Sequence, residues 1–348
     1  MKKSLLIILA LSFASIGAQN VTVKSGTTFT INSSGSLTLR ELGMTPGNLK
    51  NNGILTLNSD SNEYSSIIID GTSEGSINYN RYTNEVGSGE WDLIGSPLDG
   101  QLIGEFTTTN ASNAANGSLA TSGIYYALGS YNSSNGTWTN YTTAVDDDLT
   151  DYFDIGQGYQ AGTVTGGGLL TFTGTVASTD QTHPIQSYAG SGGKRWNLVA
   201  NPYPSYINAN SNANSTDNFL TENRSVLDSN FLAIYGWESD TNDSNSGSYN
   251  IYNNTTAATF IAPGQGFFIA AKSGGASALI FKKEMRTTAG GDDFIAGRRM
   301  KPTNSEFLLK LYEEGTFIAS TRFYFDSGLT LAMDPGYDAG AYDQSSGL

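Results

Sequence analysis

Apolar and polar residues alternate with a period of two along much of the chain, which is the pattern of a half-buried β-strand. Between residues 19 and 82 the alternation follows a glycine three times, at residues 35–39, 53–57 and 75–79. These glycines lie 18 and 22 positions apart. Strand units of about twenty residues predict a short β-solenoid or β-roll. The alternative is an antiparallel meander, because Asn52-Gly53 suits a tight turn.

A longer repeat follows, in which three groups of residues return in the same order. The spacings are 105, 106 and 108 positions, for the pairs Trp91–Pro97 and Trp196–Pro202, Ala127–Tyr131 and Ala233–Trp237, and Gly156–Tyr159 and Gly264–Phe267. Three matches at nearly one spacing indicate a duplicated β unit. We place the two copies at about residues 91–175 and 196–281.

Each copy contains the same predicted elements. A tryptophan strand ends at Pro97 or Pro202, because proline donates no ladder hydrogen bond. A hairpin follows, around Asn135-Gly136 in the first copy and between Trp237 and Tyr252 in the second. Gly-Gln-Gly-aromatic then permits a positive φ or a bulge, and a short apolar strand closes each copy.

No sustained period of 3.6 residues occurs, so we expect little helix. The predicted fold is all-β: a short β-solenoid or β-roll, then a duplicated antiparallel, jelly-roll-like β-sandwich. The two copies form either one sandwich or two small ones. The expected organisation is a signal peptide (1–18), the N-terminal β-roll (19–82), the sandwich region (83–290), a linker (291–305) and an incomplete β unit (306–348).

The N-terminus carries the pattern of a secretory signal peptide. Lys2 and Lys3 precede an apolar run over residues 5–14, and Gly17 and Ala18 supply a small-residue cleavage site. A retained anchor is the alternative, but we expect no stable membrane span after cleavage. The chain has no cysteine, which excludes disulfides and lipidation at a cysteine.

The charge narrows the choice of partners. Removal of residues 1–18, which hold two lysines and no acidic residue, changes the formal net charge from −14 to −16. An acidic chain is repelled by phosphate backbones, so we expect no nucleic-acid partner. Residues 282–302 differ in being basic and glycine-containing. We interpret them as an exposed linker, with a basic functional patch as the alternative.

Several of these motifs resemble one family, the large surface proteins that flavobacteria and their relatives export by the type IX secretion system. The similar segments are Tyr79–Tyr82, Trp91–Pro97, Trp196–Ser205, Ala262–Phe268 and the tail from Phe307 to Asp343, including Asp338-Ala339. The resemblance implies an adhesin-like protein at the outer cell surface, with the secretion machinery as a partner. Such proteins usually end in a C-terminal sorting domain, and this sequence shows none before Leu348. We therefore expect the chain to be a fragment of a longer protein.

Motifs that resemble catalytic sites lack their required context. Gly71–Gly75 matches the Gly-x-Ser-x-Gly nucleophile elbow, but it lies between predicted strands and His183 is the chain's one histidine. Gly190–Lys194 lacks the first glycine of a phosphate-binding loop and no helix follows it. Glu90 and Glu238 each adjoin a tryptophan, as in glycosidases, yet Glu90 corresponds to Arg195 in the second copy. We predict a non-enzymatic protein with no catalytic residues.

An acidic loop raises the question of calcium. Asp146–Asp148, Asp151 and Asp154 could supply oxygen ligands, and Asp240 and Asp243 lie in the corresponding loop of the second copy. The spacing does not match a helix-loop-helix calcium loop. We favour a solvated loop and predict no cofactor or metal, with calcium as the weaker alternative.

Aromatic residues around the two hairpins are the candidate ligand-binding set. They are Trp138, Tyr141, Trp237, Tyr249 and Tyr252. Sugars stack on flat aromatic faces, although such residues also fill β-sandwich cores.

The expected function is therefore a secreted, cell-surface, modular β-protein that acts in adhesion or as a structural or binding module. Its partner would be an extracellular glycan or another surface protein. The first alternative is a glycan-binding accessory module of a polysaccharide-degrading protein. The second is a hydrolase.

Overall fold

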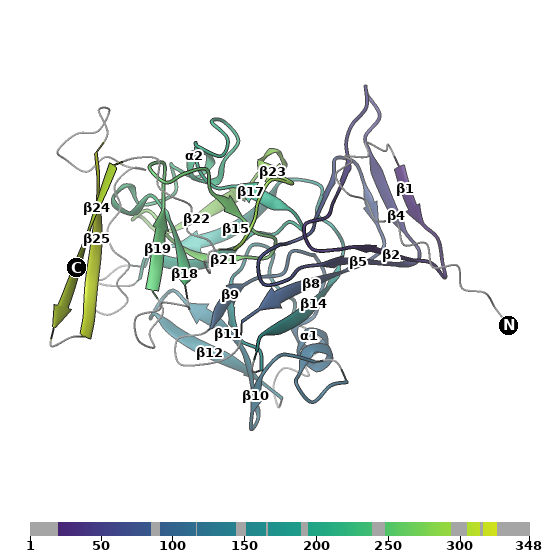
Figure 1. Cartoon of the computed structure of the whole chain (residues 1–348), viewed down its shortest axis with the longest axis horizontal. Coiled ribbons are helices and arrows are strands. Elements are labelled where there is room, and N and C mark those ends of the chain that lie inside the picture. The colour runs from purple at the N-terminus through teal and green to yellow at the C-terminus, as the bar shows by residue number, and fades with distance from the viewer. Residues whose placement is uncertain are drawn as a thin grey trace.

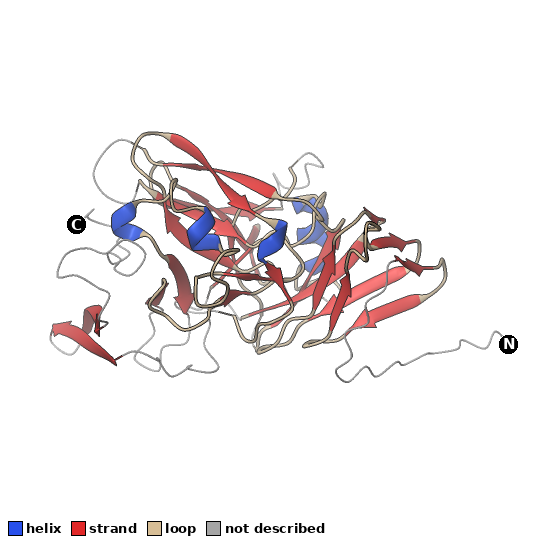
Figure 2. Ribbon diagram, turned by 90° about the horizontal axis from the view of Figure 1, so that it is seen from above, coloured by secondary structure: helices blue, strands red, loops and turns tan. Residues whose placement is uncertain are grey.

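The computed structural model describes residues 20–84, 91–115, 117–143, 151–164, 166–188, 194–238, 248–293, 305–313 and 316–325. These residues form many short β-sheets and only two α-helices, α1 (Ile103–Asn110) and α2 (Phe219–Glu222). Two 3-10 turns, η1 (Ser229–Phe231) and η2 (Lys283–Met285), complete the helical part, which Figure 2 shows as short coils among strands. The all-β prediction is confirmed.

The N-terminal strands stack in parallel on three sides. One sheet contains β1 (Asn20–Val23), β4 (Asn48–Asn51) and β7 (Ser73–Glu74), a second contains β2 (Thr28–Ile31), β5 (Ile54–Asn58) and β8 (Ile77–Thr83), and a third contains β3 (Ser36–Leu39) and β6 (Ser66–Ile69). The chain thus winds as the turns of a solenoid do, at one end of the molecule (Figure 1). Because every one of these pairs is parallel, the meander alternative is wrong for this region.

The turns are longer than the glycine spacing predicts. Paired residues lie 28 positions apart in β1 and β4, 26 in β2 and β5, and 30 in β3 and β6. In the next turn of the solenoid they lie 24 positions apart in β4 and β7 and 22 in β5 and β8. Gly35 and Gly53 precede strands of different sheets, so their spacing is less than a full turn. The alternation itself is confirmed, since Leu55, Leu57 and Tyr79 are fully buried inside the winding.

Both copies of the long repeat have the same order of strands. In the first repeat the order is β9 (Asp92–Ile94), β13 (Tyr159–Ala161), β11 (Tyr125–Asn132) and β12 (Thr137–Thr142), with β10 (Thr121–Ser122) also paired to β11. In the second repeat it is β16 (Trp196–Ala200), β21 (Gly266–Ala270), β18 (Ile234–Glu238) and β19 (Ser248–Tyr252). The tryptophan strand, the Gly-Gln-Gly strand and the hairpin therefore occupy corresponding places.

A second pair of strands extends each repeat. β8 pairs with β14 (Gly168–Gly174), and β15 (Gln181–Gln186) pairs with β22 (Ala276–Phe281), both antiparallel. Each repeat thus begins one strand before its tryptophan. β8 serves both the solenoid and the first repeat, and one core runs from Val23 to Val176. The boundary that we expected between residues 82 and 83 consequently falls inside a shared core.

The stretch after the second repeat differs from the exposed linker that we expected. Residues 286–287 form strand β23 (Arg286–Thr287), which joins β17 (Tyr206–Asn208) and β20 (Phe260–Ile261) in a small sheet. Met285 is fully buried, and the side chain of Asp293 is only 6 % exposed. The exposed-linker interpretation is therefore wrong for these residues, because Met285 packs in the core of the second repeat, and Arg286 and Asp293 bond to groups of the solenoid.

The last described strands are β24 (Ser305–Glu313) and β25 (Thr316–Phe325), which pair as an antiparallel hairpin. The predicted signal peptide lies outside the described residues, as do Glu90, Gly190–Gly193, Asp146–Asp148, Asp240 and Asp243. Within the described part of the chain, no helix is long and apolar enough to cross a membrane.

Candidate functional site

The two repeats meet in a joint that uses the same residues from each side. Ile94 bridges Gln265, and the corresponding Val199 bridges Gln157. The Gly95 N–H donates to the carbonyl of Gly264 at 2.9 Å, and the Ala200 N–H donates to that of Gly156 at 2.8 Å. The tryptophan strand of each repeat therefore contacts the Gly-Gln-Gly segment of the other.

Glycine permits this close approach. A Cβ at Gly95 would lie 2.3 Å from the Cβ of Ala200, and one at Gly266 would lie 2.7 Å from the carbonyl carbon of Leu93. Gly156 and Gly264 have positive φ values of 78° and 62°, as the sequence predicted for this motif. The repeated glycines are thus explained by packing between repeats.

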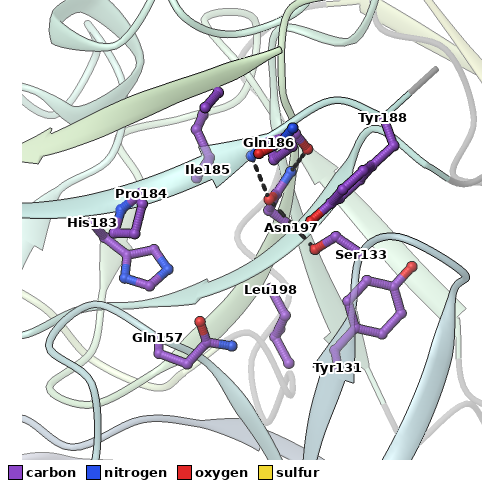
Figure 3. A pocket seen from close by; sticks show the side chains of 11 residues that line it. Tyr131, Ser133, Gln157, His183, Pro184, Ile185, Gln186, Tyr188, Asn197 and Leu198 are labelled. Carbon is purple, nitrogen blue, oxygen red and sulfur yellow. Dashed lines mark hydrogen bonds between the residues drawn. The ribbon is translucent and has the colours of Figure 1, made fainter.

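A pocket of about 250 Å³ opens beside the joint. Its walls come from both repeats, as Figure 3 shows: Tyr131, Ser133 and Gln157 from the first, and His183, Pro184, Ile185, Gln186, Tyr188, Asn197, Leu198 and Ala276 from the second. No lining residue is Asp, Glu, Lys or Arg. The pocket therefore offers amide, hydroxyl, imidazole and aromatic groups without a formal charge.

Asn197 organises one wall of the pocket. Its Oδ1 accepts from the Gln186 N–H at 2.9 Å, and its Nδ2 donates to the carbonyls of Gln186 and Arg195 at 2.9 and 2.8 Å. The Ser133 hydroxyl of the first repeat also donates to Oδ1, at 3.4 Å. This amide, which follows the repeated tryptophan, thus holds β15, β16 and the hairpin of the first repeat together.

His183 forms the opposite wall as a neutral base. Nδ1 lies 3.0 Å from the carbonyl oxygen of Ile155. Burial lowers the pKa of His183, although the hydrogen bond to Ile155 acts in the opposite direction. Because a carbonyl only accepts, the neutral ring carries its proton on Nδ1 and leaves Nε2 as an acceptor.

The corresponding position in the first repeat holds a buried, charged residue. Arg81 pairs with Leu170 on the ladder just as His183 pairs with Leu279, and each lies beside the first glycine of the other repeat's Gly-Gln-Gly. Arg81 is 1 % exposed and forms an ion pair with Asp293 at 3.2 Å.

Hydrogen bonds complete this buried network. The Tyr64 hydroxyl donates to Asp293 at 2.7 Å, and the Arg81 guanidinium donates to the Tyr82 carbonyl at 2.7 Å. The segment after β23 thus contacts the solenoid through the buried side chain of Asp293.

Asp92 is the counterpart of Asn197 in this network. It accepts from the Asn84 N–H at 2.7 Å and from the Asn84 side-chain amide at 3.2 Å. Burial, and next the charge of Asp293, raise the pKa of Asp92 to about 7, while Arg81 acts in the opposite direction. One position thus holds an amide in the second repeat and a titrating carboxyl in the first.

Three of the five predicted ligand-binding aromatics gather in one half-buried cluster. Trp138 and Tyr249 approach the ring of Phe268 with centroids 6.1 and 5.7 Å away, and Trp237 lies 4.8 Å from Tyr249. The cluster adjoins the pocket through Tyr131, whose ring lies 5.1 Å from Trp138. We call Trp138, Trp237, Tyr249 and Phe268 the aromatic cluster.

The other two predicted aromatics lie apart from it. Tyr141 packs against the core of the solenoid and first repeat, 6.4 Å from Tyr159. Tyr252 packs against the separate core of the second repeat. The structure therefore does not bring these two residues to the cluster.

The structure does not bring the catalytic look-alikes together. Ser73 lies in β7 of the solenoid, with strand β8 rather than a helix after it, whereas His183 lies in β15. Glu238 accepts a hydrogen bond from Asn250 across its own hairpin. Among the described residues, no group of three or more His, Asp or Glu side chains could hold a metal ion.

Reasoning from sequence missed the pocket residues Gln157, Gln186 and Asn197. The repeated Gly-Gln-Gly and the Asn after Trp196 marked two of them, but only as repeat motifs. Comparison with known proteins found no match among curated proteins and none among solved structures. The model of one family matches residues 6–347, nearly the whole chain. The chain therefore belongs to the family described as "Domain of unknown function (DUF8693)".

Proposed function

We propose that this chain is a non-enzymatic, secreted binding module of the cell surface that acts in adhesion. The observation that carries the proposal is the uncharged pocket that both repeats build beside their joint. Neutral polar groups and tyrosine rings are the chemistry of reversible recognition.

Support for export comes from the N-terminal sequence pattern and from the resemblance to type IX cargo. A surface location accords with the low share of charged residues, 14 %, because the polar surface must then consist mainly of neutral side chains. The partner on this proposal is an extracellular glycan or another surface protein.

A second candidate is a glycan-binding accessory module of a polysaccharide-degrading protein. The aromatic cluster favours it, because Trp138, Trp237 and Tyr249 are each only partly buried. Rings that keep an exposed face can stack on sugars.

Adsorption of the purified chain tests both candidates. We would measure binding to insoluble polysaccharides and to intact cells, for the wild type, for Trp138→Ala with Trp237→Ala, and for Tyr125→Ala as control. Tyr125 is 52 % exposed and lies outside the aromatic cluster.

The outcomes separate the candidates. If the double variant still adsorbs to cells, adhesion is supported. If its binding to polysaccharides is also unchanged, the accessory-module candidate is ruled out. Adsorption to neither material contradicts the proposed function. Hydrolysis of any glycoside or ester in a broad substrate panel contradicts the non-enzymatic assignment.

A further inference from the structure

We propose that the pocket between the repeats binds a single neutral pyranose unit, the end of a glycan chain or a free sugar. The inference rests on the proposed binding function and names its ligand class. The site differs from the aromatic set that the sequence indicated, because none of Trp138, Tyr141, Trp237, Tyr249 and Tyr252 lines the pocket.

The size of the pocket sets the size of the ligand. Its volume of about 250 Å³ lies just below the range of roughly 300–1,000 Å³ that is usual for drug-sized ligands. One sugar ring is therefore accommodated, and a chain must continue outside.

The lining selects a neutral polyhydroxy compound. The rings of Tyr131 and Tyr188 lie on one side and His183 on the other, while Gln157 reaches in from the joint (Figure 3). The ring of Tyr188, which is 39 % exposed, supplies a face on which the C–H side of a pyranose can pack. Nε2 of His183 accepts a sugar hydroxyl, and the amides both donate and accept. A carboxylate or ammonium group would be desolvated here without an opposite charge, which is costly.

The first repeat provides an internal comparison. There Arg81 stands in place of His183 and Asp92 in place of Asn197, and Asp293 lies beside them as a charged neighbour. The second repeat keeps the same strand framework and replaces these charges by neutral groups. The neutral character of the pocket is therefore a property of its side chains, because the framework also accommodates a charged set.

His183 makes the test direct. It is the only histidine in the chain, so its ring protons give one unambiguous NMR signal in protein without a histidine tag. We would titrate the chain with methyl glucoside, methyl galactoside, methyl mannoside and N-acetylglucosamine, and with glucuronate and glucosamine as charged analogues. Tyr188→Ala removes one stacking face, and Tyr125→Ala is the matched control.

We expect at least one neutral pyranose to shift the His183 signal saturably. Tyr188→Ala weakens this binding at least tenfold, Tyr125→Ala leaves it unchanged, and both charged analogues bind at least tenfold more weakly than the neutral sugar. Thermal unfolding of Tyr188→Ala checks that the variant is folded.

An oligosaccharide arm distinguishes the two sources of the sugar. If the pocket holds a glycan end, the oligosaccharide binds more tightly than the methyl glycoside, and Trp138→Ala removes that gain alone. Equal affinities assign the pocket to a free sugar.

Two results overturn the inference: no neutral pyranose moves the His183 signal, or glucuronate moves it as effectively. If the chain then still adsorbs to cells, the proposed function stands and only the pocket assignment fails.

Discussion

At the scale of single residues, corresponding positions of the two repeats have opposite electrostatic characters. Asn197 joins the second repeat through neutral hydrogen bonds, whereas Asp92 is a buried carboxyl beside Arg81 and Asp293. Because Asn197 occupies the corresponding position of the second repeat, Asp92→Asn is a conservative substitution for testing the role of the Asp92 charge.

The first prediction concerns the pH dependence of stability. Unfolded Asp92 loses its proton near pH 4, but in the folded chain burial and the Asp293 charge raise its pKa to about 7. Between these values the folded state binds more protons, so the free energy of unfolding falls as pH rises. We expect Asp92→Asn to remove this fall, gaining at most about 4 kcal/mol at pH 8 and almost nothing at pH 4.

Urea denaturation at a series of pH values measures this effect. Asp99→Asn is the control, since the Asp99 side chain is exposed. Parallel pH curves for wild type and Asp92→Asn would contradict the assignment of a raised pKa.

The second prediction compares a buried ion pair with an exposed one. The side chains of Arg81 and Asp293 are 1 % and 6 % exposed, whereas those of Lys50 and Glu74 are 55 % and 63 % exposed. Arg81→Leu removes the cation beside the buried carboxyls of Asp92 and Asp293 and should cost about 3–5 kcal/mol of unfolding free energy. Lys50→Met should cost less than about 1 kcal/mol. Similar losses in chemical denaturation would show that the Arg81 network does not stabilise the fold.

At the scale of elements, the Gly-Gln-Gly strands do more than form sheets inside their own repeats. Each also contacts the tryptophan strand of the other repeat, and β21 lies against the backbone of β9 at Gly266. The joint therefore requires short side chains at particular strand positions.

The third prediction tests this dependence. A Cβ at Gly266 would lie 2.7 Å and 2.8 Å from backbone atoms of Leu93 and Ile94, which cannot move as a flexible side chain can. We expect Gly266→Ala to lower the free energy of unfolding by about 1–3 kcal/mol.

Gly291→Ala provides the matched control, because its Cβ would meet nothing within 4 Å and its φ is not in the left-handed region. It should change stability by less than about 0.5 kcal/mol. Equal stability of the two variants in thermal and urea unfolding would contradict the close-packed joint.

At the scale of the whole molecule, the solenoid and the repeats are held together at several places. Besides the core from Val23 to Val176, the Ile67 N–H donates to the Pro204 carbonyl at 2.7 Å, and Arg286 donates to the carbonyl of Ile69 at 3.0 Å. The second repeat is thus fastened to the solenoid as well as to the first repeat.

The fourth prediction is that solenoid and repeats unfold together. All four tryptophans lie in residues 91–237, so tryptophan fluorescence reports on the repeats. The chain has no cysteine, and Met44 is 97 % exposed, so Met44→Cys accepts a dye that reports on the solenoid. We expect both signals to share one urea midpoint, since a shared core unfolds cooperatively. A separate, earlier transition of the dye would contradict a single unit.

Much of the fold was predictable from local pattern. The alternation before residue 82, the hairpin turn at Asn135-Gly136 and the strand ends at Pro97 and Pro202 all depend on residues that are close in sequence. Helix α1 was not predicted. Its only apolar side chains, Ile103 and Phe106, are buried, and Phe106 stacks on Phe172 from a distant strand, which eight residues of sequence do not reveal.

The candidate site was much less predictable. Trp138, Trp237 and Tyr249 were identified by residue type and do gather, but the pocket residues His183, Gln157 and Asn197 come from three separate strands or turns. None of them has a local signal that distinguishes it from an ordinary surface or turn residue.

The sequence by itself determined the all-β class, the corresponding elements of the two repeats and the positions of their turns. These follow from the periodicity and backbone preferences of neighbouring residues. Only the tertiary structure decided that the repeats join through their glycines, that Arg81 and Asp293 form a buried pair, and that His183 and Gln157 face one pocket. The physical reason is distance along the chain. Contacts between residues 26 to 212 positions apart depend on how whole sheets pack, and local alternation carries no information about that packing.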